Sequence, residues 1–219
     1  MKVIGIDLSG PSNHRDTFLA VFEKKENELS FVKCDGNLSD EDILNEIAAL
    51  AQVDEVVIGI DAPLSYQDGG GDRKSDRELR KFIVKLGMRS GSIMPPTLTK
   101  MVYLTLRGIR LSREISGIVT AHPISIVEVH PGAVMGSRVH PKELSFVLTY
   151  KQEIESRNFL LKWLTHQGLK GIPSLVADET HSLDACAAAL GAWHWKDSAY
   201  SPKWLFPADP PLHPFVYCC

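Results

Sequence analysis

The segment DEVVIGID at residues 54–61 repeats, near the middle of the chain, the pattern KVIGID of residues 2–7. Both segments contain a continuous run of apolar, largely β-branched residues, which is typical of strands buried on both faces of a sheet. Both end in Gly-Ile-Asp, so Asp7 and Asp61 stand at the carboxyl ends of the predicted strands. In open α/β sheets, binding sites form outside these strand ends. The repeated pattern therefore predicts an α/β protein with two acids at one edge of its sheet.

The residues between these two strands predict how they are connected. Residues 16–25 and 27–36 are two further extended stretches separated by a polar turn, which predicts a three-strand meander. Residues 39–52 place Ser39 at an N-cap position ahead of apolar residues at helical spacing, so we expect a helix there. Because a helical crossover joins strands that run parallel, the sheet is expected to have mixed pairing.

The second half of the chain predicts an insertion, a third strand, two helices and a tail. Residues 62–123 read as a helical insertion that follows the strand ending in Asp61. The third strand, within residues 124–136, is expected to break into a turn at Pro131. The proline-rich tail is expected to lie extended against the body, without regular structure. The third strand, the two helices and the tail occupy residues 124–136, 150–168, 178–195 and 198–219.

Bulk composition narrows the class of protein. A length of 219 residues suits a single domain with a sizeable core. No run approaches the roughly 18 apolar residues of a membrane span. Because the first residues form a strand-like run, we expect no targeting leader. The four cysteines show no zinc-type spacing. We therefore expect a cytoplasmic protein with no membrane partner; the sequence predicts no oligomeric state.

Residues 181–191, HSLDACAAALG, predict a helix face that carries both functional and small side chains. His181, Asp184 and Ala188 are spaced three or four residues apart, and Gly191 continues the same face. Because Ala188 and Gly191 are small, this face can approach the sheet closely. We therefore expect the helix to bring His181 and Asp184 to the edge where the two strands end.

Three carboxylates, from Asp7, Asp61 and Asp184, would form a hard-oxygen site suited to Mg²⁺ or Mn²⁺. Sites of this kind hold two ions, one of which activates water while the other stabilises the leaving oxygen of a phosphodiester. In this interpretation His181 adds a ligand or shuttles a proton. The alternative is that each strand-end aspartate only caps a turn and that His181 and Asp184 decorate an exposed helix end.

The insertion carries a local excess of positive charge. Residues 72–113 contain eleven Lys and Arg residues against three Asp and Glu residues, in a chain of net charge −3. Basic patches bind nucleic-acid phosphates, so we expect nucleic acid as a partner through the insertion. The alternative is a set of solvated helix faces. The candidate substrate-binding residues are Arg73, Lys74, Arg77, Arg80, Lys81 and, after the third strand, His130.

The motifs GIDLSG, GIDAPLS, VEVHPGA and HSLDACAAALGA resemble those of the RNase H-like nuclease family catalogued as domain of unknown function 429. The last motif is also similar to the closing helix of RuvC-type Holliday-junction resolvases. The resemblance implies a ribonuclease H-like fold, in which a mixed five-stranded sheet is flanked by helices. By this resemblance Asp7 is the first-strand acid, Asp61 the fourth-strand acid and Asp184 the closing-helix acid, with His181 beside it. Glu128 or Glu179 is a candidate for a fourth acid.

These patterns lead to one principal hypothesis and two alternatives. The principal hypothesis is a metal-dependent nuclease that hydrolyses a phosphodiester by a two-metal mechanism. An actin- or sugar-kinase-like phosphotransferase is the first alternative, because GIDLSGPSN faintly resembles a phosphate-binding hairpin, although the second Asp-x-Gly motif of that class is missing. The second alternative is a non-catalytic nucleic-acid-binding protein.

Overall fold

The two segments that share Gly-Ile-Asp are neighbouring strands at the centre of one mixed sheet, in a computed structural model that describes residues 1–219. Strands β1 (Lys2–Asp7) and β4 (Val56–Asp61) pair in parallel, with Gly5 opposite Gly59 and Asp7 opposite Asp61. The predicted parallel direction of these strands is therefore confirmed, and the structure makes them direct neighbours.

The remaining long strands complete a five-strand centre. Strands β2 (Phe18–Lys25) and β3 (Glu28–Gly36) continue from β1 as the predicted antiparallel meander. On the other side β5 (Ile124–Val129) pairs in parallel with β4. The predicted mixed pairing is confirmed.

The sheet nevertheless has eight strands, not the expected five, in the order β6-β3-β2-β1-β4-β5-β8-β7. The additional strands are β6 (Leu169–Lys170), β7 (Leu205–Phe206) and β8 (Tyr217–Cys218). The tail was expected to have no regular structure, and this is wrong at β7 and β8, which extend the sheet beyond β5. Strands of two residues are too short to show an alternating pattern, and they pair only because the fold lays the tail beside β5.

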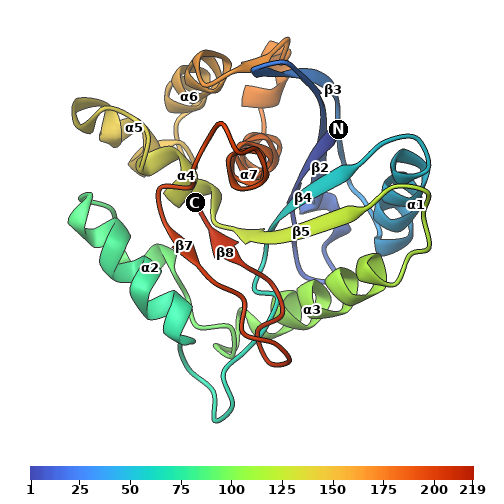
Figure 1. Cartoon of the computed structure of the whole chain (residues 1–219). Coiled ribbons are helices and arrows are strands. Elements are labelled where there is room, and N and C mark those ends of the chain that lie inside the picture. The colour runs from blue at the N-terminus through green and yellow to red at the C-terminus, as the bar shows by residue number, and fades with distance from the viewer.

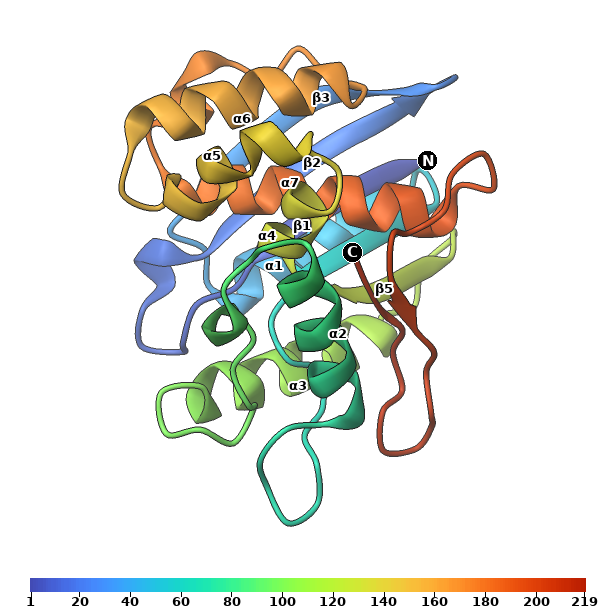
Figure 2. The same cartoon turned by 90° about the vertical axis from the view of Figure 1, so that its left-hand side faces the viewer.

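Seven helices surround the sheet (Figures 1 and 2). They are α1 (Asp40–Ala51), α2 (Lys74–Lys85), α3 (Val102–Ser116), α4 (Pro131–Gly136), α5 (Leu144–Thr149), α6 (Ile154–His166) and α7 (Thr180–Lys196). The expected cap of α1 is present, since the Ser39 hydroxyl accepts from the Asp42 amide. Strand β5 ends at Val129, before Pro131 as expected, but the predicted turn is the helix α4, which Pro131 begins because a proline in the first helical turn loses no hydrogen bond. No helix combines the length and apolar character needed to cross a membrane.

The two faces of the sheet carry separate cores. Helix α7 lies across the middle of one face, with α4, α5 and α6 beside it, and α1 and α3 cover the other face (Figure 1). Side chains of the central strands alternate between these cores: Val3 and Val57 pack on the α7 side, Ile4 and Ile58 on the α1 side. By the same alternation, Asp7 and Asp61 belong to the face that α7 covers.

Candidate acidic site at the carboxyl edge of the sheet

Glycines in the two central strands allow the backbone of α7 to lie directly on the sheet. A Cβ atom at Gly5 would stand 1.8 Å from the Ala185 carbonyl oxygen, and one at Gly59 would stand 2.5 Å from that of Ala188. No larger residue fits at either position unless the helix moves away. The Gly-Ile-Asp pattern thus has a structural meaning: the glycine seats the helix, and the aspartate two residues later emerges beside its N-terminal turn.

Helix α7 brings His181 and Asp184 to the strand-end acids, as the sequence predicts. His181 Nδ1 donates to Asp7 Oδ2 at 2.7 Å, and the imidazole stacks on Phe18 with 6.0 Å between ring centroids. Asp184 is buried. Its Oδ1 accepts from the Tyr150 hydroxyl at 2.7 Å, and its Oδ2 lies 3.4 Å from Lys151 Nζ. The site therefore includes two residues, Tyr150 and Lys151, that the sequence patterns did not indicate.

The acids perturb one another's ionisation. Burial raises the pKa of Asp7 to about 6; the hydrogen bond from His181 opposes this rise, and the Asp184 charge adds to it. Burial, followed by the charges of Asp7 and Asp184, raises the pKa of Asp61 well above its usual value. The hydrogen bond to Asp7 in turn raises the pKa of His181. Burial is the larger cause of both shifts, and the charges of the neighbouring acids add to it because the carboxylates lie close together.

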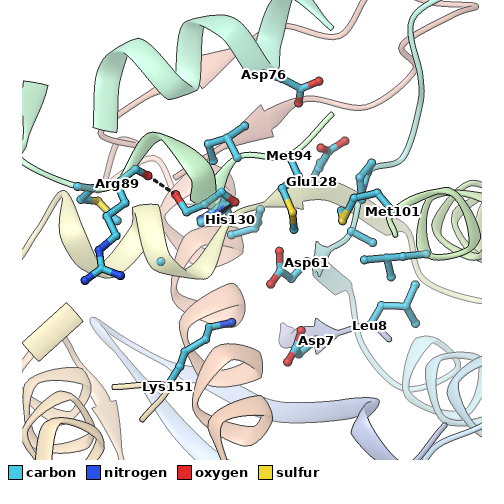
Figure 3. A pocket seen from close by; sticks show the side chains of 18 of the residues that line it. Asp7, Leu8, Asp61, Asp76, Arg89, Met94, Met101, Glu128, His130 and Lys151 are labelled. Atoms are coloured by element: carbon cyan, nitrogen blue, oxygen red, sulfur yellow. Dashed lines mark hydrogen bonds between the residues drawn. The ribbon is translucent and has the colours of Figure 1, made fainter. Parts of the chain in front are cut away.

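Asp61 is the acid without a partner. Its carboxylate forms no hydrogen bond within the protein, and Lys151 is the cation that opposes its raised pKa. Asp61 and Asp7 both line a cavity of about 450 Å³ and point into it in Figure 3. A half-buried carboxylate that faces a cavity without a donor has oxygen lone pairs free for a ligand.

The donor set suits a hard divalent cation, because carboxylate oxygens are the ligands that Mg²⁺ and Mn²⁺ prefer. As the side chains are arranged here, no three acids or histidines are grouped as ligands of one ion. Asp184 instead contacts Tyr150 and Lys151. For all three aspartates to bind an ion, Asp184 therefore has to release Lys151 and contact the ion instead. The Lys151 side chain is 58% exposed and able to move away.

The cavity that Asp7 and Asp61 line lies between the sheet edge, α5 and the segment that joins α2 to α3, and neither Asp184 nor His181 is part of its lining. In Figure 3, Lys151 and the more distant Arg89 lie to the left of Asp7 and Asp61, and Met94 and Met101 lie above Asp61. Arg89 and both methionines come from the segment that joins α2 to α3 and ends where α3 begins. No local pattern marks these residues, because they meet the acids only through tertiary folding.

Glu128, the candidate fourth acid, lines the same cavity but is engaged by other groups. Its Oε1 accepts from Arg73 Nη2 at 2.5 Å, and its Oε2 accepts from Arg73 Nη1 and from the Leu64 amide. Arg73 also pairs with Asp76 at 2.7 Å and is itself buried. Glu128 and Arg73, predicted as metal ligand and substrate contact, are therefore held by each other. The other candidate, Glu179, is exposed at the start of α7 and does not line the cavity.

The remaining basic candidates lie on α2, outside the lining of the cavity. Arg80 pairs with Asp72 at 2.6 Å and Lys81 with Glu78 at 3.0 Å. Arg77 donates to the Asp72 carbonyl oxygen, and Lys74 lies over the Phe206 ring. The structure does not bring these four side chains to the acids.

His130 does line the cavity. Its Nδ1 accepts from the Ala133 amide at 3.0 Å, so the proton is on Nε2, which lies 3.2 Å from the Ser92 carbonyl oxygen. Burial lowers the pKa of this imidazole. His130 thus acts here as a neutral link between the start of α4 and the segment that carries Arg89 and Met94.

Comparison with known proteins gives one match. Residues 5–211 match the model of the family described as protein of unknown function DUF429. No curated protein matches the chain, and no solved structure does so either. The matched range contains both Gly-Ile-Asp motifs, α7 and all the residues that line the cavity except Tyr217. The chain therefore belongs to the DUF429 family.

Proposed function

We propose that this protein is a metal-dependent nuclease that hydrolyses a phosphodiester bond of nucleic acid, on a ribonuclease H-like fold. The observation that carries the proposal is the register pairing of Asp7 with Asp61, to which α7 adds Asp184 and His181. The fold proposal is supported by the meander β1–β3, by the parallel strands β4 and β5, and by the position of the acids on the first and fourth strands.

The proposed cofactor is a pair of Mg²⁺ or Mn²⁺ ions held by Asp7, Asp61 and Asp184. Such ions, when bound, would supply Lewis acidity at the phosphodiester and an activated water molecule. Asp61, which no protein donor engages, has the freest carboxylate for this purpose. Tyr150 holds Asp184 through its hydroxyl and so fixes the direction of the third carboxylate.

The other cavity residues have roles that follow from their charge. Lys151 and Arg89 can neutralise the phosphate of the scissile bond as it enters beside the acids. His181 orients Asp7 through Nδ1, and its side chain is 33% exposed, so the imidazole can exchange a proton with solvent. Buried Arg73 has a different role, because it fixes the cavity wall through Glu128 and Asp76.

Titration calorimetry with Mn²⁺ tests the proposal directly. The wild type is compared with the double variant Asp7→Asn, Asp184→Asn and with a control, Glu41→Gln, Asp68→Asn, which removes two exposed acids elsewhere. We expect Mn²⁺ binding in the wild type and the control, and its loss in the first variant. The same proteins are then incubated with DNA and RNA, and Mn²⁺-dependent cleavage should follow the same order. Equal Mn²⁺ binding by all three proteins would contradict the assignment of the site.

A further inference from the structure

The walls of the cavity differ in chemical character. The lining includes apolar side chains, among them Met94, Met101 and Leu104, and the charged groups of Arg89 and Lys151. Figure 3 shows Met94 and Met101 on one wall, above Asp61, and Lys151 and Arg89 on another, to its left. Asp61 lies between Lys151 and the two methionines, with Asp7 below it. A ligand that complements this cavity has an apolar part at one end and an anionic part beside the acids and cations.

The methionine wall is held in place by packing and hydrogen bonds. Met101 directly precedes α3, and the Thr105 hydroxyl on the first turns of α3 donates to the Pro96 carbonyl oxygen at 2.9 Å. Farther along α3, a Cβ at Gly108 would stand 2.8 Å from the Pro63 carbonyl oxygen, so the helix is seated closely on the chain that leaves β4. The thioethers therefore face the cavity from a fixed backbone.

Methionine is suited to contact a flat ring. Its thioether is polarizable, its side chain adapts to irregular shapes, and sulfur makes favourable contacts with aromatic rings. Met94 and Met101 are only partly buried, whereas Met88, which also lines the cavity, is buried and packs against Gly136. Partly buried thioethers on a cavity wall leave apolar surface that a ligand can cover.

The wall formed by Arg89 and Lys151 has positive charge available. Arg89 is exposed and forms no ion pair in the structure, and the single acid that Lys151 contacts is Asp184, at 3.4 Å. This differs from Arg73, Arg80 and Arg107, whose guanidinium groups are paired with acids of the protein. A phosphate placed beside the strand-end acids therefore lies in the part of the cavity that Lys151 and the unpaired Arg89 line.

We propose that the cavity receives one unpaired nucleotide, with its base against Met94 and Met101 and its phosphate between the acids and Lys151. The substrate is then a single strand or a nucleotide extruded from a duplex, and not an intact duplex. This inference rests on the proposed nuclease function. A volume of about 450 Å³ lies within the range of small-ligand sites. A paired base inside a duplex is stacked on both faces and cannot reach the methionine wall.

The first test measures binding, not cleavage, with adenosine 5′-monophosphate and ribose 5-phosphate as probes. The two probes carry the same phosphate, and only the first has a base. We expect the wild type to bind the nucleotide at least about tenfold more tightly, because base stacking adds to the phosphate contacts. The variant Met94→Ala, Met101→Ala should lose most of this preference.

Two further proteins serve as controls. Leu106→Ala alters an exposed residue of α3 that does not line the cavity, and it should keep the preference of the wild type. Met94→Leu, Met101→Leu keeps an apolar wall of similar volume, and it should retain binding if the wall acts through contact with the base. Equal affinity of the wild type for both probes, or an unchanged preference in the double alanine variant, would overturn the inference.

A second test separates this inference from the nuclease proposal. Cleavage in Mn²⁺ is measured on a single-stranded oligonucleotide, a blunt duplex, and the same duplex with one bulged nucleotide. We expect the single strand and the bulged duplex to be cleaved faster than the blunt duplex. Faster cleavage of the bulged duplex would show that one extruded nucleotide is sufficient. Cleavage of the blunt duplex at an equal rate contradicts the inference and leaves the nuclease proposal standing. Base-dependent binding without any cleavage would support the nucleotide-binding inference and contradict the nuclease proposal.

Discussion

Asp7 and Asp61 are register partners at the ends of the two central parallel strands, and each follows by two residues a glycine on which the backbone of α7 rests. This relationship links the stability of the fold to the site. Any change that lifts α7 from the sheet also moves Asp184 and His181 away from the strand-end acids. The following predictions test that link and the electrostatics around it.

Gly5→Ala should disrupt the site by displacing α7. Its Cβ would meet the Ala185 carbonyl oxygen at 1.8 Å, where only backbone movement gives relief. We expect a loss of about 3 kcal/mol or more in the free energy of unfolding, measured by urea denaturation, together with weaker Mn²⁺ binding. Gly10→Ala is the matched control, because nothing lies within 4 Å of its Cβ. A Gly5→Ala protein as stable as the control would show that the helix does not rest on this residue.

Asp7→Asn should stabilise the protein when divalent ions are absent. The pKa of Asp7 is raised by burial from 3.8 to about 6 in the folded state. The folded state therefore binds a proton more tightly than the unfolded chain, and stability falls as the pH rises from about 4 to 6. At pH 7.5 the neutral amide removes this penalty, and we expect the free energy of unfolding to rise by about 1–3 kcal/mol in EDTA.

The same variant should lose its advantage in Mn²⁺, because an ion that binds only the folded wild type stabilises it. Thermal unfolding in EDTA and in Mn²⁺ measures both effects. Asp68→Asn, which alters an exposed acid, should respond as the wild type does. An Asp7→Asn protein that Mn²⁺ stabilises as strongly as the wild type would argue against the ion site.

Arg73→Met should affect stability more than substrate binding. Removal of the guanidinium leaves Glu128 and Asp76 buried without their cation, and a broken buried pair typically costs about 3–5 kcal/mol. Lys85→Met, on the exposed end of α2, should change the free energy of unfolding by less than about 0.5 kcal/mol. Denaturant titration of both proteins provides the comparison. If Arg73 instead serves the substrate, the variant will unfold like the wild type and bind nucleic acid less well.

His194 should make the protein less stable in mild acid. Burial, aided by the charges of Arg138 and Lys203, lowers its pKa from 6.5 to about 4. The unfolded chain then binds more protons between about pH 4 and 6.5, so stability is lost as the pH falls through this range. We expect His194→Phe, which can keep the stacking on Tyr200, to remove about 2 kcal/mol of this acid sensitivity. Urea midpoints at pH 7 and pH 4.5 measure the difference, and parallel profiles for the two proteins would contradict it.

Much of the central fold could be predicted because its signals are local. Continuous β-branched runs identify the buried strands, and the small residues of α7 indicate a helix that packs closely. The two Gly-Ile-Asp endings point to acids at one sheet edge, since parallel strands end on the same side. The edge strands β7 and β8 could not be predicted, because two-residue strands depend on the partner that the fold places beside them.

The number of basic residues in the insertion does not predict how many of them are available to a ligand. The sequence identifies eleven basic residues there, but it does not reveal which of them are neutralised. Arg73 pairs with Glu128 across 55 positions, and Arg107 with Asp40 across 67. These partners become neighbours only when α2 and α3 dock on the sheet.

The sequence by itself therefore determined the central strands, the close seat of α7 and the identity of the acids, because strand and helix periodicities are properties of short segments. The tertiary structure decided which side chains face those acids. Lys151, Arg89, Tyr150 and the methionine wall reach the cavity through packing between segments far apart in the chain. It also decided the ionisation of Asp7 and Asp61, since burial and neighbouring charge exist only after folding.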